Sequence, residues 1–200
     1  MPSGFPKMSF PSEIATYVGR MRDFTRVDWL VYVSWVGLMS GLVLSTGGFL
    51  LLGHSHGVSF TPEAWLVPLG SLLFTISIAV DTIGHRTIYK QEISGAEGLV
   101  HGITILCGIT SCVLLTLAYH YPRSLWIPAL VLTALAFIYS LVDEAFHWRR
   151  YVRKHSDRVE MWSHLGILTG HAVMMLGWWV WFFQGYPGVT ATLKSLGEGT

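Results

Sequence analysis

The chain alternates long apolar runs with short polar segments, and this pattern predicts its elements. Five runs are almost free of charge, at residues 29–52, 65–80, 102–119, 125–142 and 165–183. A helix of about 20 apolar residues spans the hydrocarbon core of a bilayer. The second run reaches that length only if its helix continues through Asp81 and His85. We therefore predict an all-α integral membrane protein with five transmembrane helices.

The polar segments divide the chain into three parts. Residues 1–27 are expected to form a cytoplasmic N-terminal segment, 28–186 the five-helix membrane domain, and 187–200 a polar C-terminal tail. The first apolar run is followed by Gly-His-Ser-His-Gly at 53–57, which is not a small-residue cleavage site. The first run is therefore predicted to be a retained helix.

Composition supports the membrane class. Of the 200 residues, 52% are hydrophobic and only 12% are charged, about half the charged share that is usual for a soluble domain. The two cysteines, Cys107 and Cys112, lie inside one apolar run, which excludes a disulfide framework and a paired CxxC zinc site. The expected surroundings are the lipid bilayer, and we expect no nucleic-acid partner.

The basic residues predict an orientation. Eleven of the thirteen lie before the first helix, between the second and third, or between the fourth and fifth, and only Arg123 and Lys194 lie on the other side. Loops rich in Lys and Arg stay in the cytoplasm. The sequence therefore predicts a multi-pass protein of the inner (plasma) membrane, with a cytoplasmic N-terminus and a periplasmic or extracellular C-terminus.

A repeat links the second and third helices to the fourth and fifth. VDTIGHRTIY at 80–89 and VDEAFHWRRY at 142–151 share the pattern Val-Asp-x-x-x-His-x-x-x-Tyr, and each is followed by Glu-x-x-x-His, at 97–101 and 160–164. The two hairpins, 62–119 and 122–185, run in the same direction, which implies an axis along the membrane normal. We predict a pseudo-twofold four-helix bundle to which the first helix is added.

The repeat predicts a metal site. Positions i and i+4 share one helix face, so each bundle helix presents one carboxylate and one imidazole on a single stripe near the cytoplasmic end. Counting from the turns places Asp81 near the depth of His101 and His85 near that of Glu97. The second hairpin likewise matches Asp143 with His164 and His147 with Glu160. Glu144 adds a Glu-x-x-His spacing, and His171 lies two turns deeper than His164. The predicted ligand set is Asp81, His85, Glu97, His101, Asp143, Glu144, His147, Glu160, His164 and His171.

These ligand types indicate a chemistry. A set of imidazoles and carboxylates without cysteine suits iron first, with copper, manganese or zinc as alternatives, and its size favours two transition-metal ions. A pair of such ions inside an apolar bundle predicts a membrane oxidoreductase. It would act with dioxygen on a lipidic or quinone-like substrate, a hydrophobic small molecule, at the cytoplasmic face.

Three other functions stay open at this point. A b-type haem subunit of an electron-transfer complex would hold haem b between paired histidines, either His101 with His164 or His85 with His147. A metal transporter would need acids along the whole path, yet the outer halves of these helices carry none beyond Glu63. The nine tryptophans would also suit contact with a membrane-protein partner or a homo-oligomer.

His54 and His56 are interpreted as residues of a flexible loop.

Overall fold

The computed structural model describes residues 9–88, 95–154 and 158–197, and all regular elements in these ranges are helical. Lys7, Tyr89 and Lys90 lie outside them. The elements are α1 (Phe10–Gly19), a 3₁₀ turn η1 (Arg20–Asp23), α2 (Arg26–Ser55), α3 (Pro62–Thr87), α4 (Gly95–Leu117), α5 (Pro122–Lys154), α6 (Arg158–Phe183) and α7 (Val189–Gly197). Helices α2 to α6 are each long and apolar enough to cross a membrane. The predicted all-helical class is confirmed, as are five helices of the length and composition that a membrane span needs.

The long helices extend past their apolar runs into the polar residues. α3 continues through Asp81 and His85 to Thr87, as its length required, and α5 includes Asp143 and His147. The carboxylate–histidine pairs therefore lie within regular helices, which define the spacing and the side-chain rotamers of each pair. The short helices α1 and α7 lie in the segments where only polar ends of the chain were expected.

Local signals set the helix ends. Thr25 and Asp28 form a capping box at the start of α2, in which each side chain accepts a hydrogen bond from the other residue's backbone N–H. α2 and α6 both end in a Schellman motif, with Gly57 (φ 79°) and Gly185 (φ 78°) in the left-handed region. These glycines stop the two helices and turn the chain at the same end of the bundle.

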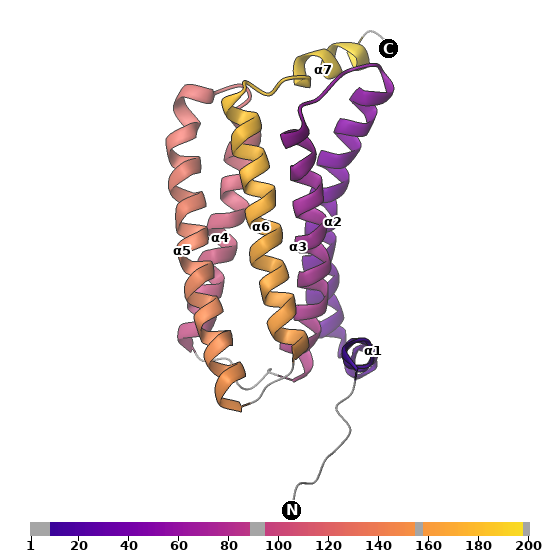
Figure 1. Ribbon diagram of the computed structural model, residues 1–200, viewed down its shortest axis with the longest axis vertical. Helices are drawn as coiled ribbons and strands as arrows, with labels where there is room; N and C mark the ends of the chain where they lie inside the picture. Colours follow the sequence, from indigo (N-terminus) through magenta and orange to yellow (C-terminus); the bar gives the residue numbers. More distant parts are fainter. Residues whose placement is uncertain (1–8, 89–94, 155–157, 198–200) are drawn as a thin grey trace, which may run out of the picture.

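The helices pack in two pairs, α3 with α6 and α4 with α5, while α2 lies on the outside of α3 (Figure 1). Helices α3 and α6 approach each other closely because glycines of α6 lie against the backbone of α3. A Cβ on Gly170 would lie 2.5 Å from the backbone nitrogen of Phe74, and one on Gly177 would lie 2.7 Å from the carbonyl oxygen of Glu63. Small residues allow such close approach in membranes, where packing replaces the hydrophobic drive. This contact aligns the polar end of α3 with that of α6.

The two ends of the bundle differ in character. We call the end that holds α1, the start of α2, the end of α5 and the start of α6 the basic end. At the opposite end an apolar core forms around Trp178, Trp179 and Trp181, and α7 lies across it (Figure 1). Tyr186 closes this end, because its hydroxyl donates to the carbonyl of Leu115 at 2.5 Å. The packed core leaves the polar side chains gathered near the basic end.

Helix α1 lies at one side of the basic end, against α3 and α6, and is seen along its axis in Figure 1. Tyr17 is buried against Ile83 and Val159, at the ends of α3 and α6. Arg158 donates two hydrogen bonds to the Glu13 carboxylate, at 2.6 and 3.1 Å. These contacts hold α1 against the ends of α3 and α6 that carry Asp81 and Glu160.

Candidate metal centre

The repeated carboxylate–histidine pairs meet at one level of the bundle, near its basic end. α3 and α5 carry Asp–His pairs in their last turns, and α4 and α6 carry Glu–His pairs in their first turns. The carboxylate residues are buried, with exposures of 5% for Asp81, 4% for Glu97, 6% for Asp143 and 2% for Glu160. His147 and His164 are buried as well. The structure thus brings together ionisable side chains from four helices in a largely apolar protein.

Two of the carboxylates each lie between two imidazoles. Asp81 contacts His85 of its own helix at 3.3 Å and His164 of α6 at 3.0 Å. Asp143 contacts His147 of its own helix at 3.7 Å and His101 of α4 at 3.0 Å. Each half of the cluster is therefore a His–Asp–His triple that joins two helices. We call them the Asp81 triple and the Asp143 triple.

His101 Nδ1 and Asp143 Oδ2 form a hydrogen bond of 3.0 Å, but other atoms of the triples lack one. Asp81 Oδ1, His164 Nε2 and Asp143 Oδ1 are buried and form no hydrogen bond of acceptable geometry within the described residues, although Asp81 Oδ1 and His164 Nε2 lie 3.0 Å apart. Buried polar atoms are normally hydrogen-bonded, so each exception needs an explanation. Two ligands about 2.1 Å from one ion and at right angles to each other are about 3.0 Å apart. A metal ion shared by these two atoms would account for both the distance and the missing bond.

The two triples meet at their histidines. The ligand nitrogens of His85, His147 and His164 all lie within 4.8 Å of one another. The rings of His147 and His164 stack with their centroids 3.4 Å apart, and those of His85 and His147 are 5.8 Å apart. The triples are therefore neighbours in one volume, close enough to act on a single small molecule.

Three glutamates surround the triples. His147 Nδ1 lies 2.9 Å from Glu160 Oε1, the contact expected from counting residues from the turn, and its Nε2 lies 3.8 Å from Glu97. Glu144 lies 3.4 Å from His164, on the neighbouring helix. The Glu-x-x-His spacing at 144–147 therefore directs its two side chains to different partners. These carboxylates are placed to orient imidazoles or to add ligands.

The remaining predicted histidines lie elsewhere. His171 stacks on Phe137 at 4.5 Å, deeper in the bundle, and has no contact with the two triples in the described part of the chain. His54 and His56 belong to the last turn and C-cap of α2, at the opposite end. They are thus parts of a helix end, where a loop was expected.

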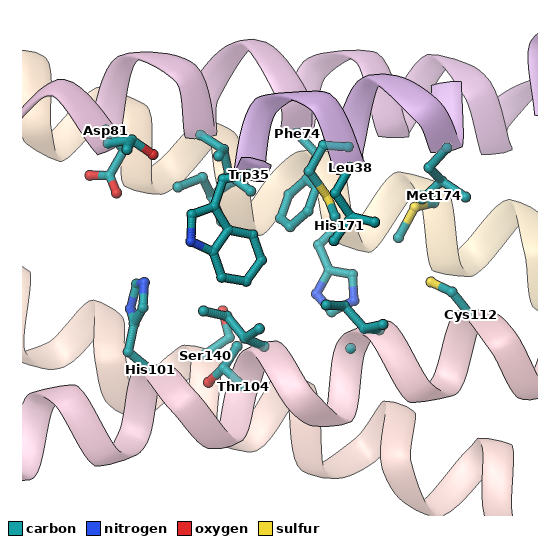
Figure 2. A pocket seen from close by; sticks show the side chains of 18 of the residues that line it. Trp35, Leu38, Phe74, Asp81, His101, Thr104, Cys112, Ser140, His171 and Met174 are labelled. Carbon is teal, nitrogen blue, oxygen red and sulfur yellow. The ribbon is translucent and has the colours of Figure 1, made fainter. Parts of the chain in front are cut away.

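A cavity of about 590 Å³ adjoins the cluster (Figure 2). At the basic end its wall includes Asp81, His101, Asp143, Glu144 and His164. From there it extends between α2 and α4 past Trp35 and His171 to Cys112 and Met174. Sequence reasoning did not assign α2 to the site. The only sequence signal was the glycines Gly37, Gly41 and Gly108, which line the cavity and leave it wide.

The surroundings of His147 show whether this histidine could ligate a haem. A porphyrin bound to His147 needs open space around the ligating nitrogen. That nitrogen, Nε2, lies 3.7 Å from Asp143 and 3.8 Å from Glu97, and the His164 ring covers the imidazole at 3.4 Å. This arrangement disfavours a porphyrin bound to His147, whereas the other pair named for haem, His101 and His164, lines the adjoining cavity.

Comparisons of the chain with models of known families, with curated proteins and with solved structures found no match. Five apolar helices are consistent with a multi-pass membrane protein.

Proposed function

We propose that this chain is a membrane-embedded oxidoreductase that uses a pair of metal ions, iron in the first place, to act with dioxygen on a hydrophobic substrate. The observation that carries the proposal is the pair of His–Asp–His triples. Two histidines and one carboxylate on one face of an ion, with other positions open, are the ligand set of non-haem iron(II) oxygenases. Each triple offers one such set.

The internal repeat supports two equivalent ions. A twofold rotation that superposes α3 on α5 and α6 on α4 relates Asp81 to Asp143, His85 to His147 and His164 to His101. The observed contacts follow this rotation, since each aspartate contacts the histidine four residues on and one histidine from the other hairpin. The pairing of α3 with α6 and α4 with α5 follows it too. We infer a pseudo-twofold bundle with one ion per triple.

The glutamates supply what a pair of ions needs beyond the triples. Carboxylates from neighbouring helices bridge and ligate the metals of di-iron bundles. Glu97 and Glu160 flank His147, and Glu144 contacts His164, so all three are near enough to take such roles. Negative charge at these positions also balances two divalent ions inside the membrane, where unpaired charge is costly.

The proposed reaction reduces dioxygen completely. One dioxygen takes up four electrons and four protons to give two waters. Two substrate molecules supply them, each losing two electrons and two protons. Buried histidines and carboxylates at the cluster can hold the protons during transfer, and the apolar cavity excludes water from the substrate.

We place the reaction at the cytoplasmic face of an inner or plasma membrane. The basic end carries the arginines that precede α2 and those at the end of α5, which is the distribution of cytoplasmic loops. Under this orientation the N-terminus is cytoplasmic and α7 lies on the far side. The amphipathic α1, tied to α6 through Glu13 and Arg158, would then rest on the cytoplasmic surface.

Mössbauer spectroscopy of protein loaded with ⁵⁷Fe tests the proposal. We expect two high-spin Fe(II) sites in the anaerobic protein and a spin-coupled, EPR-silent Fe(III) pair after exposure to dioxygen. Asp81→Ala should leave an uncoupled Fe(III) ion with an EPR signal, because only the Asp143 triple remains. His54→Ala, at the opposite end, should behave like the unaltered protein. Two uncoupled Fe(III) signals in the unaltered protein would contradict a shared site.

A further inference from the structure

The cavity beside the cluster opens sideways, toward the bilayer. α2 packs on α3 and α7 and has no packing contact with α4 in the part of the chain that the structure describes. Leu38 of α2 and Val113 of α4 both line the cavity and still expose 49% and 50% of their surface. Both residues lie in membrane-spanning helices. The gap between α2 and α4 is therefore a path from the lipid to the cluster.

The imidazole of His171 points into the middle of this cavity. His171 is 5% exposed, is stacked on Phe137 at 4.5 Å with an interplanar angle of 12°, and lies 5.7 Å from the Phe74 ring. It lines the cavity and forms no hydrogen bond within the described residues (Figure 2). A neutral imidazole has one donor and one acceptor nitrogen, and leaving both without a hydrogen bond in an apolar site is unfavourable. The two aromatic rings hold His171 ready for a polar ligand atom.

The spacing selects the ligand. His171 follows His164 by seven residues on α6, or about 10 Å along the helix axis. Figure 2 shows the Trp35 ring between the Asp81–His101 end of the cavity and His171. A single six-membered aromatic ring with oxygens at opposite positions spans such a gap when each oxygen makes a hydrogen bond of about 2.8 Å. Trp35 and Phe74 offer faces for stacking that ring.

We propose that the cavity binds a membrane hydroquinone, with one hydroxyl at the metal cluster, the other at His171, and its apolar chain leaving between α2 and α4. This inference rests on the proposed function and names its substrate. In each turnover both O–H bonds of the hydroquinone break, and the ring becomes a quinone. One proton goes to His171 and the other goes to a carboxylate of the cluster. The metal ions, when bound, would supply the route by which the two electrons reach dioxygen. Two turnovers reduce one dioxygen to two waters.

Binding of a benzoquinone with a ten-carbon chain, measured by equilibrium dialysis on the metal-loaded protein in detergent, tests the site. Gly108 lines the cavity and has open space around an added Cβ, so Gly108→Leu should fill the cavity without moving the helices. We expect it to raise the dissociation constant at least about tenfold. Gly102→Leu is the matched control, because this glycine of α4 is equally open but does not line the cavity. It should bind the quinone like the unaltered protein.

His171 separates this site from the metal site. His171→Phe keeps the aromatic stack but removes both nitrogens, and should weaken quinone binding about tenfold with unchanged metal content. His171→Gln, which keeps a donor and an acceptor, should restore part of the affinity. Loss of metal from His171→Phe would make this residue a metal ligand and overturn its assignment to the quinone. A cyclohexane with the same chain that displaces the quinone at equal concentration would overturn recognition of the oxygens.

The outcomes of these experiments also distinguish failure of the quinone site from failure of the proposed metal-dependent oxidoreductase. Metal-loaded protein that binds no quinone, or whose quinone affinity is unchanged by Gly108→Leu, overturns the quinone site and leaves the metal centre standing. Protein that holds no metal but binds the quinone with the expected effects of Gly108→Leu and His171→Phe overturns the oxidoreductase and supports the binding site.

Discussion

Replacing Asp81 with alanine is expected to lower the bound iron from about two ions per chain to about one, because it removes the carboxylate of one triple and leaves the other intact. Asp143→Ala should have the same effect on the second ion. The double variant should bind almost none. Losing only a hydrogen-bond partner of a ligand typically costs about 10–100-fold in metal affinity, and these changes remove the carboxylate ligand itself.

Elemental analysis of the purified variants measures this directly. His54→Ala is the control, since it changes a histidine outside the cluster at the opposite end of α2. Circular dichroism should show that all the variants remain helical, because the α3–α6 contact through Gly70, Gly170 and Gly177 does not depend on the metal. Equal iron content in Asp81→Ala, Asp143→Ala and the unaltered protein would rule out the triples as the ligand sets.

Metal binding is also expected to stabilise the fold strongly. Asp81 and Asp143 are buried in the bundle, and their contacts in the described residues are with histidines alone. Bringing two carboxylates out of water is costly, and an ion at each triple offsets that cost. At a free metal concentration of 100 times the dissociation constant, each site adds about 2.7 kcal/mol to the free energy of unfolding.

Unfolding by SDS in mixed micelles, with and without Mn²⁺, checks this expectation. Mn²⁺ suits the same imidazole and carboxylate ligands and stays divalent in air. The unaltered protein should gain about 5 kcal/mol if both sites fill, whereas the double variant Asp81→Ala/Asp143→Ala should gain nothing. A gain of the same size in the double variant would show that the metal acts elsewhere on the chain.

The spans were predictable because the bilayer imposes a length. The apolar runs mark helices α2 to α6, and the need for about 20 residues extended α3 through Asp81 and His85, as the structure has it. Helix α1 was not predicted. Its contacts depend on Tyr17, Glu13 and Arg158, residues whose partners lie far away in the sequence.

The pairing of the helices could be predicted only in part. The i, i+4 spacing placed each carboxylate and histidine on one face, but a stripe does not say which helix it faces. Counting from the turns matched His147 with Glu160 correctly. It placed Asp81 at the depth of His101, and Figure 2 shows both at the same end of the cavity, but depth alone did not reveal that Asp81 contacts His164. The physical reason is the close approach of α3 and α6 at Gly70 and Gly170, which brings α6 to α3.

The cavity was beyond sequence reasoning for a related reason. Its walls come from five helices, and its width depends on α2 packing against α3 and not against α4. The cavity is also wide because three of its lining residues have no side chain, which a pattern of apolar residues does not reveal: Gly37, Gly41 and Gly108. His171 was grouped with the metal ligands because it shares a helix face with His164, and only the structure shows its stacking on Phe137.

The central claim, two metal ions held by the paired triples, is tested most directly by an absorption spectrum and elemental analysis of protein purified without chelators. We expect about two transition-metal ions per chain, iron before copper, manganese or zinc, and no Soret band. A Soret band with one iron per haem would contradict the account and make this chain a b-type haem protein. Absence of any metal would leave the triples as charge-paired helix ends.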